Sequence, residues 1–269
     1  MKSFFSCMTL FVVAATFFSC SKDKLHQHKE WKAFFEANGL EGCVMLHDYY
    51  GGTFDVYGLG EVQARTLPGG TFNIMNALVG LETGVVRDTS MLLPDTAASG
   101  PLAGLSMGRA FRTGNRAYFQ WVARKVGHAR MQYWIDSTYY GNQQIGTDLS
   151  AFWTNNTLTI SPDEQMGLME KLYQGRLAFQ SRSQQLVKAL LIQRTTHSDT
   201  LRYISGTGQE KSGTVSWLVG WLQHKDEPHF FVLKALAADS ATQLADKSLN
   251  ILYKVLQAKG LATETGRLN

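Results

Sequence analysis

The chain has 269 residues, of which 44% are hydrophobic, and a mass of 30.0 kDa, so it can bury a substantial core in one large domain. Its formal charge of +4 is small and is not gathered into a basic tract, which argues against nucleic-acid binding. No internal repeat or low-complexity segment is visible, so a single folded unit is the simplest interpretation.

The N-terminus carries a predicted export signal over residues 1–19. Lys2 precedes an apolar run that ends at Phe18, which is too short to span a membrane and fits a signal peptide. Cys20 follows a small residue where the chain turns polar, and this arrangement resembles the lipobox of bacterial lipoproteins. We therefore expect a periplasmic or outer-membrane lipoprotein of a Gram-negative-type bacterium that contacts the membrane through lipidated Cys20 only. Cleavage without lipidation is the alternative.

A polar tether is predicted over residues 20–29, ahead of a single domain over residues 30–269. His26 and His28 stand two residues apart in the tether. Their spacing would permit metal binding, but two solvated histidines are the preferred interpretation, and we predict neither a metal site nor a cofactor. Cys43 lies in an apolar run without a cysteine partner in the mature chain, so we expect a buried, unreactive thiol.

The first half of the mature chain predicts a hairpin followed by a central helix. Two runs of strand-forming residues flank the loop Tyr49-Tyr50-Gly51-Gly52, which is typical of a β-hairpin. Apolar residues recur at helical spacing from Phe72 to Leu81, and Gly84 suits the end of that helix. The predicted elements in order are a helix over 28–38, strands over 44–46 and 53–57, the helix over 72–84 and a long surface loop over 87–107.

The second half predicts helices and then consecutive strands. The clearest start is at Ser161, because Ser161 can cap a helix, Pro162 suits its first turn and Glu164 can complete a capping box. The remaining predicted elements are helices over 117–127, 130–135 and 184–193, strands over 201–204, 215–222 and 229–236, and a final helix over 241–258. Strands at both ends of the chain with helices between them predict an α+β fold.

Motifs along the mature chain resemble, in order, those of class D β-lactamases and the related penicillin-binding proteins. Residues 68–84 are similar to the family segment Pro-Ala-Ser-Thr-Phe-Lys-Ile with the Asn-Ala-Leu and Leu-Glu-Thr-Gly that follow it. Tyr140-Gly141-Asn142 matches the Tyr-Gly-Asn motif, Trp153 lies where an active-site tryptophan is expected, and residues 205–208 align with Ser-Lys-Thr-Gly. The resemblance implies a five-stranded antiparallel sheet from the N- and C-terminal segments, flanked by helices, an all-helical lobe, and a pocket between sheet and lobe.

The positions that carry the family's chemistry are substituted in this chain. Family members place a nucleophilic serine on the first helical turn and a lysine, carbamylated as general base, three residues later. Here Gly70 has no side chain to attack with, and Asn73 accepts no proton near neutral pH. The resemblance places substituted family positions at Gly70, Asn73, Gly114, Arg116 and Gly206. A register shift of one residue would instead bring Thr113 to the family's second serine.

Other residues that the resemblance places around the pocket are candidates for ligand contact, although each can equally serve the packing of the fold. They are Thr71, Phe72, Tyr140, Gly141, Asn142, Trp153, Ser205, Thr207 and Gly208.

Three interpretations follow. The first is a non-hydrolytic binding or scaffolding module of the cell envelope, with a β-lactam or peptidoglycan peptide as non-covalent ligand and an unspecified protein partner. The second is an active serine or threonine hydrolase that uses a displaced nucleophile, which would be Thr71, Thr113 or Ser205. The third is an unrelated envelope protein without the sheet and helical lobe. If only side chains were lost, Gly70→Ser, Asn73→Lys, Gly114→Ser and Gly206→Lys together would restore β-lactam hydrolysis.

Overall fold

The computed structural model describes residues 24–93, 104–237 and 243–262, so the predicted signal peptide and Cys20 lie outside the described residues. The strands are β1 (Lys24–Gln27), β2 (Glu41–Asp48), β3 (Thr53–Tyr57), β4 (Ile192–Thr195), β5 (Asp199–Glu210), β6 (Gly213–His224) and β7 (Glu227–Ala237). The α-helices are α1 (Lys32–Glu36), α2 (Asn73–Glu82), α3 (Met107–Arg112), α4 (Arg116–Val126), α5 (His128–Thr138), α6 (Pro162–Gln174), α7 (Ser181–Leu190) and α8 (Leu244–Ala258). Short 3-10 turns are η1 (Lys29–Trp31), η2 (Leu59–Glu61) and η3 (Gly69–Phe72).

The described strands form one sheet in the order β1-β3-β2-β7-β6-β5-β4. The five central strands pair antiparallel, as predicted, and come from both terminal segments of the chain. Two short edge strands add to this prediction: β4 pairs antiparallel with β5, and β1 pairs parallel with β3. Residues 24–27 are therefore part of the sheet, and the predicted tether over residues 20–29 is wrong for this part.

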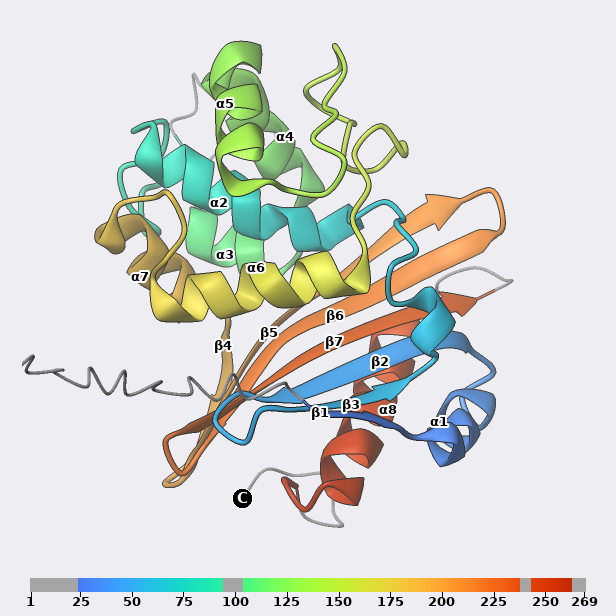
Figure 1. The fold of residues 1–269 in the computed structure, drawn as a ribbon. Helices are drawn as coiled ribbons and strands as arrows, with labels where there is room; N and C mark the ends of the chain where they lie inside the picture. The colour runs from blue at the N-terminus through green and yellow to red at the C-terminus, as the bar shows by residue number, and fades with distance from the viewer. Residues whose placement is uncertain (1–23, 94–103, 238–242, 263–269) are drawn as a thin grey trace, which may run out of the picture.

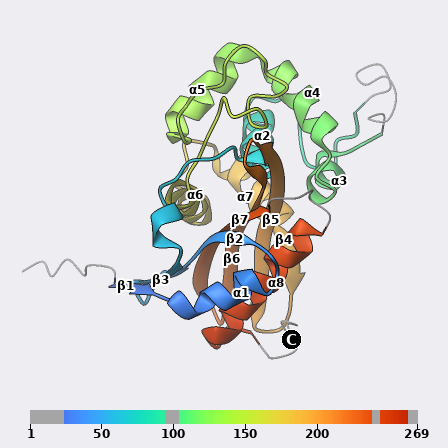
Figure 2. The same ribbon diagram turned by 90° about the vertical axis from the view of Figure 1, so that its right-hand side faces the viewer.

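Both faces of the sheet are covered by helices (Figures 1 and 2). The lobe that contains α2 to α7 lies above the sheet in both views, and α1 and α8 lie below it. Two apolar clusters follow this division, because Trp217 and Trp221 belong to the cluster on the lobe side, whereas Leu218 and Leu222 pack with α8. Burial on both faces explains why β6 is a continuous apolar run rather than an alternating one.

Helix α2 forms the centre of the lobe, as predicted. Every residue from Asn73 to Leu81 is buried, which is the expected environment for a helix that is predominantly apolar around its circumference. Helices α4 and α7 pack against it. The turn η3 immediately precedes α2 and contacts β5 and β6. The start of α2 therefore lies beside these two strands.

The predicted start of α6 at Ser161 is confirmed. The Glu164 carboxylate accepts from the Ser161 backbone N–H at 3.0 Å, which completes a capping box with Pro162 in the first turn. Helix α3 was not predicted; it is six residues long and fills the stretch between the predicted loop over 87–107 and the predicted helix over 117–127. No described helix is long and apolar enough to cross a bilayer.

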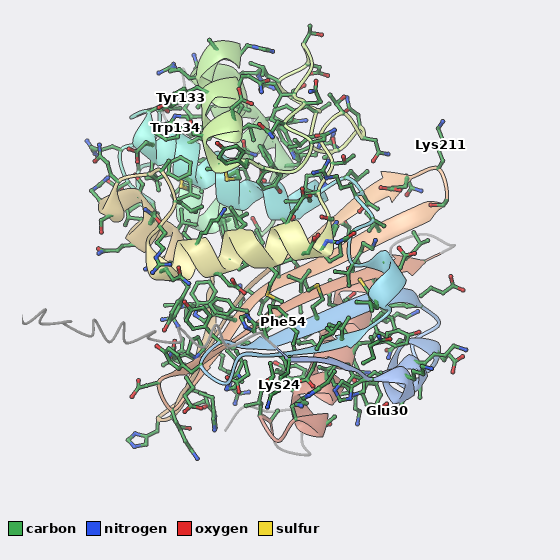
Figure 3. The ribbon with its side chains drawn as sticks, viewed as in Figure 1. Lys24, Glu30, Phe54, Tyr133, Trp134 and Lys211 are labelled. Atoms are coloured by element: carbon green, nitrogen blue, oxygen red, sulfur yellow. The ribbon has the colours of Figure 1, made fainter. Side chains whose placement is uncertain are left out.

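In Figure 3, Lys24 and Glu30 mark the β1 edge of the sheet, and Lys211 marks the tip of the β5–β6 hairpin.

Candidate functional site

One pocket of about 410 Å³ is lined by many of the residues that the sequence singled out. It lies where η3, the start of α2, the turn before α4 and the end of β5 meet. The five positions that the resemblance identifies as substituted all line it: Gly70, Asn73, Gly114, Arg116 and Gly206. The predicted ligand candidates Trp153, Ser205, Thr207 and Gly208 line it as well, together with Thr154, Gln209 and Ala245, which the sequence analysis had missed.

The wall of this pocket at Gly70 is formed by two backbones in direct contact. A Cβ on Gly206 would lie 2.4 Å from the backbone nitrogen of Thr71 and 2.8 Å from the Cα of Gly70. A Cβ on Gly70 would lie 2.9 Å from the Cα of Gly206. Real Cβ atoms do not approach backbone atoms so closely, so neither position has room for a side chain while η3 lies on β5.

Hydrogen bonds from three directions hold the segment before α2 in this place. The Trp217 indole donates to the Leu67 carbonyl at 2.9 Å, and the Leu67 N–H donates to the Glu210 carboxylate at 3.1 Å. The Gly69 N–H donates to the Trp153 carbonyl at 3.0 Å. Gly69 has a φ of +52°, which L side chains rarely adopt, and its Cα faces the Thr207 carbonyl. The close approach of η3 and β5 is thus braced by β6 and by the loop at Trp153.

Arg116 gives the pocket its charge. It is the single charged residue among the described lining residues, and its guanidinium donates to the Thr154 hydroxyl at 2.9 Å across the opening. The neighbouring Asn115 side chain turns away and caps α4 by accepting from the Tyr118 N–H at 2.9 Å. Arginine cannot lose its proton near neutral pH, so the pocket presents a permanent positive charge.

Comparisons with known proteins agree with this arrangement. Residues 41–257 match the family described as the penicillin binding protein transpeptidase domain. The chain belongs to this family. Probable beta-lactamase YbxI of Bacillus subtilis (strain 168) is 31% identical over 85% of this chain and 84% of its own length. Beta-lactamase OXA-10 of Pseudomonas aeruginosa is 27% identical over 97% of this chain and 99% of its own length.

Solved structures place the chain on the class D side of the transpeptidase family. The class D β-lactamase YbXI from Nostoc superposes with a TM-score of 0.81 at 28% identity, covering 87% of this chain and 100% of that one. The class D β-lactamase from Sebaldella termitidis ATCC 33386, at 23% identity and a TM-score of 0.85, supports the fold alone. The interpretation as an unrelated envelope protein is therefore wrong.

Thr71 does not line the pocket, although the sequence made it a candidate nucleophile in place of the missing serine. Its side chain is buried, donates to the Pro68 carbonyl at 2.8 Å and accepts from the Gln165 amide at 2.8 Å. Thr113 is exposed but also lies outside the lining, and its hydroxyl donates to the Arg109 carbonyl at 2.9 Å. Both hydroxyls are committed to local backbone, so the predictions that place a nucleophile at Thr71 or Thr113 are not supported by the geometry.

Phe72 and Tyr140 belong to the core beneath the pocket and not to its lining. Phe72 is fully buried and stacks on Trp153 with ring centroids 5.4 Å apart, and the Tyr140 ring meets it edge-on at 5.4 Å. Burial raises the pKa of the Tyr140 hydroxyl well above its usual range. Neither residue lines the pocket, and Phe72 supports the pocket wall at Trp153 from beneath.

Gly141 and Asn142 brace a neighbouring loop. Asn142 donates through its amide nitrogen to the Thr157 carbonyl at 2.9 Å and accepts at its amide oxygen from the Thr159 N–H at 3.1 Å. Gly141 has a φ of +53°, and a Cβ there would lie 1.9 Å from the Thr159 carbonyl oxygen. Gly141 and Asn142 do not line the pocket and instead hold the loop that runs between Trp153 and Ser161.

Ser205 is the remaining predicted nucleophile, and its exposed side chain does line the pocket. The described lining contains no histidine, lysine or carboxylate that could accept its proton. The other reactive side chain considered, Cys43, is fully buried in β2, and burial raises the pKa of its thiol to about 12. The predicted burial of Cys43 is confirmed.

Proposed function

We propose that this protein is a non-hydrolytic member of the class D β-lactamase and penicillin-binding group, exported to the cell envelope and anchored there through Cys20. The observation that carries the proposal is the packing of Gly70 against Gly206. The resemblance assigns the nucleophilic serine and a pocket lysine to these two positions. Here both backbones occupy the space into which such side chains would extend.

The remaining lining supports binding rather than acyl transfer. Acylation needs a hydroxyl with a base within hydrogen-bond reach, and loss of several members of such a unit is steeply non-additive. The described lining offers the hydroxyls of Ser205, Thr207 and Thr154 and a guanidinium that cannot act as a base. A bound ligand would therefore keep its scissile bond.

The charge and size of the pocket indicate a small anionic ligand. A carboxylate can form charge-assisted hydrogen bonds with Arg116, and a cavity of about 410 Å³ falls in the range of small-molecule sites. A β-lactam or a peptidoglycan peptide with a free carboxylate fits this description. We propose such a ligand, bound non-covalently, with scaffolding of an envelope protein as the wider role and no part for nucleic acid.

The first test is covalent labelling. The purified protein, incubated with a fluorescent penicillin and separated under denaturing conditions, is expected to carry no label, and it should hydrolyse a chromogenic cephalosporin no faster than buffer. A stable adduct or turnover above background would contradict the proposal. In that event, loss of the activity in Ser205→Ala would establish the second interpretation, a displaced nucleophile at Ser205.

The second test is non-covalent binding of benzylpenicillin, measured by calorimetry. Arg116→Gln is expected to weaken binding by about tenfold, because it removes a charge-assisted hydrogen bond. Lys125→Gln is the matched control, since Lys125 is exposed on the same helix, α4, and does not line the pocket. Equal affinity in wild type, Arg116→Gln and Lys125→Gln would contradict the role of Arg116.

A further inference from the structure

A second pocket lies at the other end of the same sheet face. It has a volume of about 300 Å³ and is bounded by the end of α6, by α7, by the start of β4 and by β5 and β6. It shares no lining residue with the pocket at Gly70. Arg202, near the start of β5, lines the second pocket, whereas residues 205–209 of the same strand line the first.

The second pocket is rich in cationic and donor groups. Arg202 and Lys188 line it, and no carboxylate does. Lys188 donates to the Tyr173 carbonyl at 3.2 Å, which leaves further N–H groups of its ammonium unused. The indole Nε1–H of Trp221 is buried and has no acceptor among the described residues. Donors therefore outnumber acceptors, which favours an anion.

Arg202 is unusual because it is a partly buried cation without a carboxylate partner. Its guanidinium lies over the Trp221 ring, 5.6 Å from the centroid, and forms no ion pair within the described chain. Burial lowers the pKa of Arg202 from its usual value, and the nearby Tyr173 hydroxyl offsets only part of that effect. Buried arginines are normally paired with a carboxylate. Because Arg202 has no such partner among the described residues, the N–H groups of its planar guanidinium can bind the carboxylate of a ligand.

The walls of this pocket are apolar and partly aromatic. Trp221 is fully buried, Tyr173 meets it edge-on with centroids 5.8 Å apart, and Ile192 at the mouth is 41% exposed. An inorganic anion would leave the exposed Ile192 and the partly buried Tyr173 in contact with water. A ligand with a flat apolar body would cover these two side chains and place its charge at the guanidinium.

We propose that this second pocket binds a small organic carboxylate, with the carboxylate on Arg202 beside Trp221 and the apolar body against Tyr173 and Ile192. Lys188 adds a second positive charge at the rim. The site is independent of the proposed function, because none of its residues belongs to the pocket at Gly70.

The test uses the full mature chain, labelled with ¹⁵N, and follows the tryptophan Nε1–H signals by NMR during titration with benzoate. Trp221→Phe assigns the signal of Trp221 without removing a described hydrogen bond. We expect a saturable shift of that signal, with benzamide and inorganic phosphate at least about tenfold weaker, because benzamide lacks the charge and phosphate lacks the apolar body. No saturable shift, or equal binding of benzamide or phosphate, would overturn the proposal.

Substitutions of Arg202 complete the test. Arg202→Gln should weaken benzoate by about tenfold, whereas Arg194→Gln, on the neighbouring strand and outside the lining, should leave affinity unchanged. If Arg202→Gln fails to fold by thermal unfolding, Arg202→Lys, which keeps the charge but loses the planar fork, should still weaken benzoate. Unchanged affinity in the folded Arg202 variant, or equal losses in it and Arg194→Gln, would refute the site.

Discussion

Replacement of Gly206 by alanine is expected to destabilise the protein by on the order of 1–3 kcal/mol or more, because the new methyl group meets backbone rather than a movable side chain. The closest atoms to the added Cβ are the backbone nitrogen of Thr71 and the Cα of Gly70. The φ of Gly206 lies outside the left-handed region, so lack of space, and not backbone conformation, causes the loss. The midpoint of thermal unfolding, measured by calorimetry, should fall by about 2 °C or more.

Gly167→Ala provides the matched control. Gly167 lies inside α6, and a Cβ there would meet no heavy atom within 4 Å. Alanine is the better helix former, so this variant should gain about 0.5–1 kcal/mol. If Gly206→Ala and Gly167→Ala unfolded at the same temperature, the contact between η3 and β5 would be loose, and the argument from Gly70 and Gly206 would fail.

The same contact changes the expected result of restoring family residues. The sequence alone led to the expectation that the fourfold variant Gly70→Ser, Asn73→Lys, Gly114→Ser and Gly206→Lys would recover hydrolysis if only side chains were lost. Side chains at positions 70 and 206 would force η3 away from β5, although Trp217, Glu210 and Trp153 hold the segment before it. We therefore expect a destabilised variant without hydrolysis. Hydrolysis together with an unchanged unfolding midpoint would contradict this expectation.

Elements with strong local signals could be predicted from the sequence. The capping residues at Ser161 and Glu164 act within one helical turn, and the apolar spacing from Phe72 to Leu81 records burial of a single helix. Strand β1 could not be predicted in this way. All four of its residues are exposed, so no apolar alternation marks it, and its pairing with β3 depends on a distant segment.

The candidate site shows the same difference between features with a local sequence signal, which could be predicted, and features that depend on contacts between distant segments, which could not. Motif positions identified nine of the twelve residues that line the pocket, because the fold brings aligned positions together. The close approach of Gly70 and Gly206 was not visible, since each glycine alone indicated only a missing side chain. The positive charge contributed by Arg116 and the bracing role of Asn142 also depend on contacts between segments, which a local pattern does not record.

The stability of the β1 edge should depend on Asp55. This carboxylate is 2% exposed and accepts from the His28 ring at 2.6 Å and from the Lys259 ammonium at 2.8 Å. His26 lies 3.6 Å from the same carboxylate, and Glu30 lies 2.7 Å from His28. The prediction of two solvated histidines is therefore wrong for His28, which stacks on Trp31 and links the N-terminal segment to the sheet.

Asp55→Asn is expected to cost about 1–3 kcal/mol at neutral pH, because it leaves the Lys259 ammonium and the His28 ring without their carboxylate acceptor. Burial alone would raise the pKa of Asp55, but the hydrogen bonds from Lys259 and His28 outweigh it and hold the pKa below the usual 3.8. A lowered pKa means that the unfolded chain binds the proton first as the pH falls. The contribution is thus complete above about pH 4 and is lost as the pH falls through the folded pKa.

Thermal unfolding of wild type and Asp55→Asn between neutral pH and about pH 3 measures this contribution. The gap between their midpoints should be largest near neutral pH and should narrow in acid, because protonated Asp55 resembles asparagine in charge. Asp226→Asn, in the exposed β6–β7 turn at a φ of +70° that asparagine tolerates, is the matched control and should follow the wild type throughout. A gap that stays constant with pH would show that Asp55 acts through packing and not through its charge, and no gap would show that the link to His28 and Lys259 adds nothing to stability.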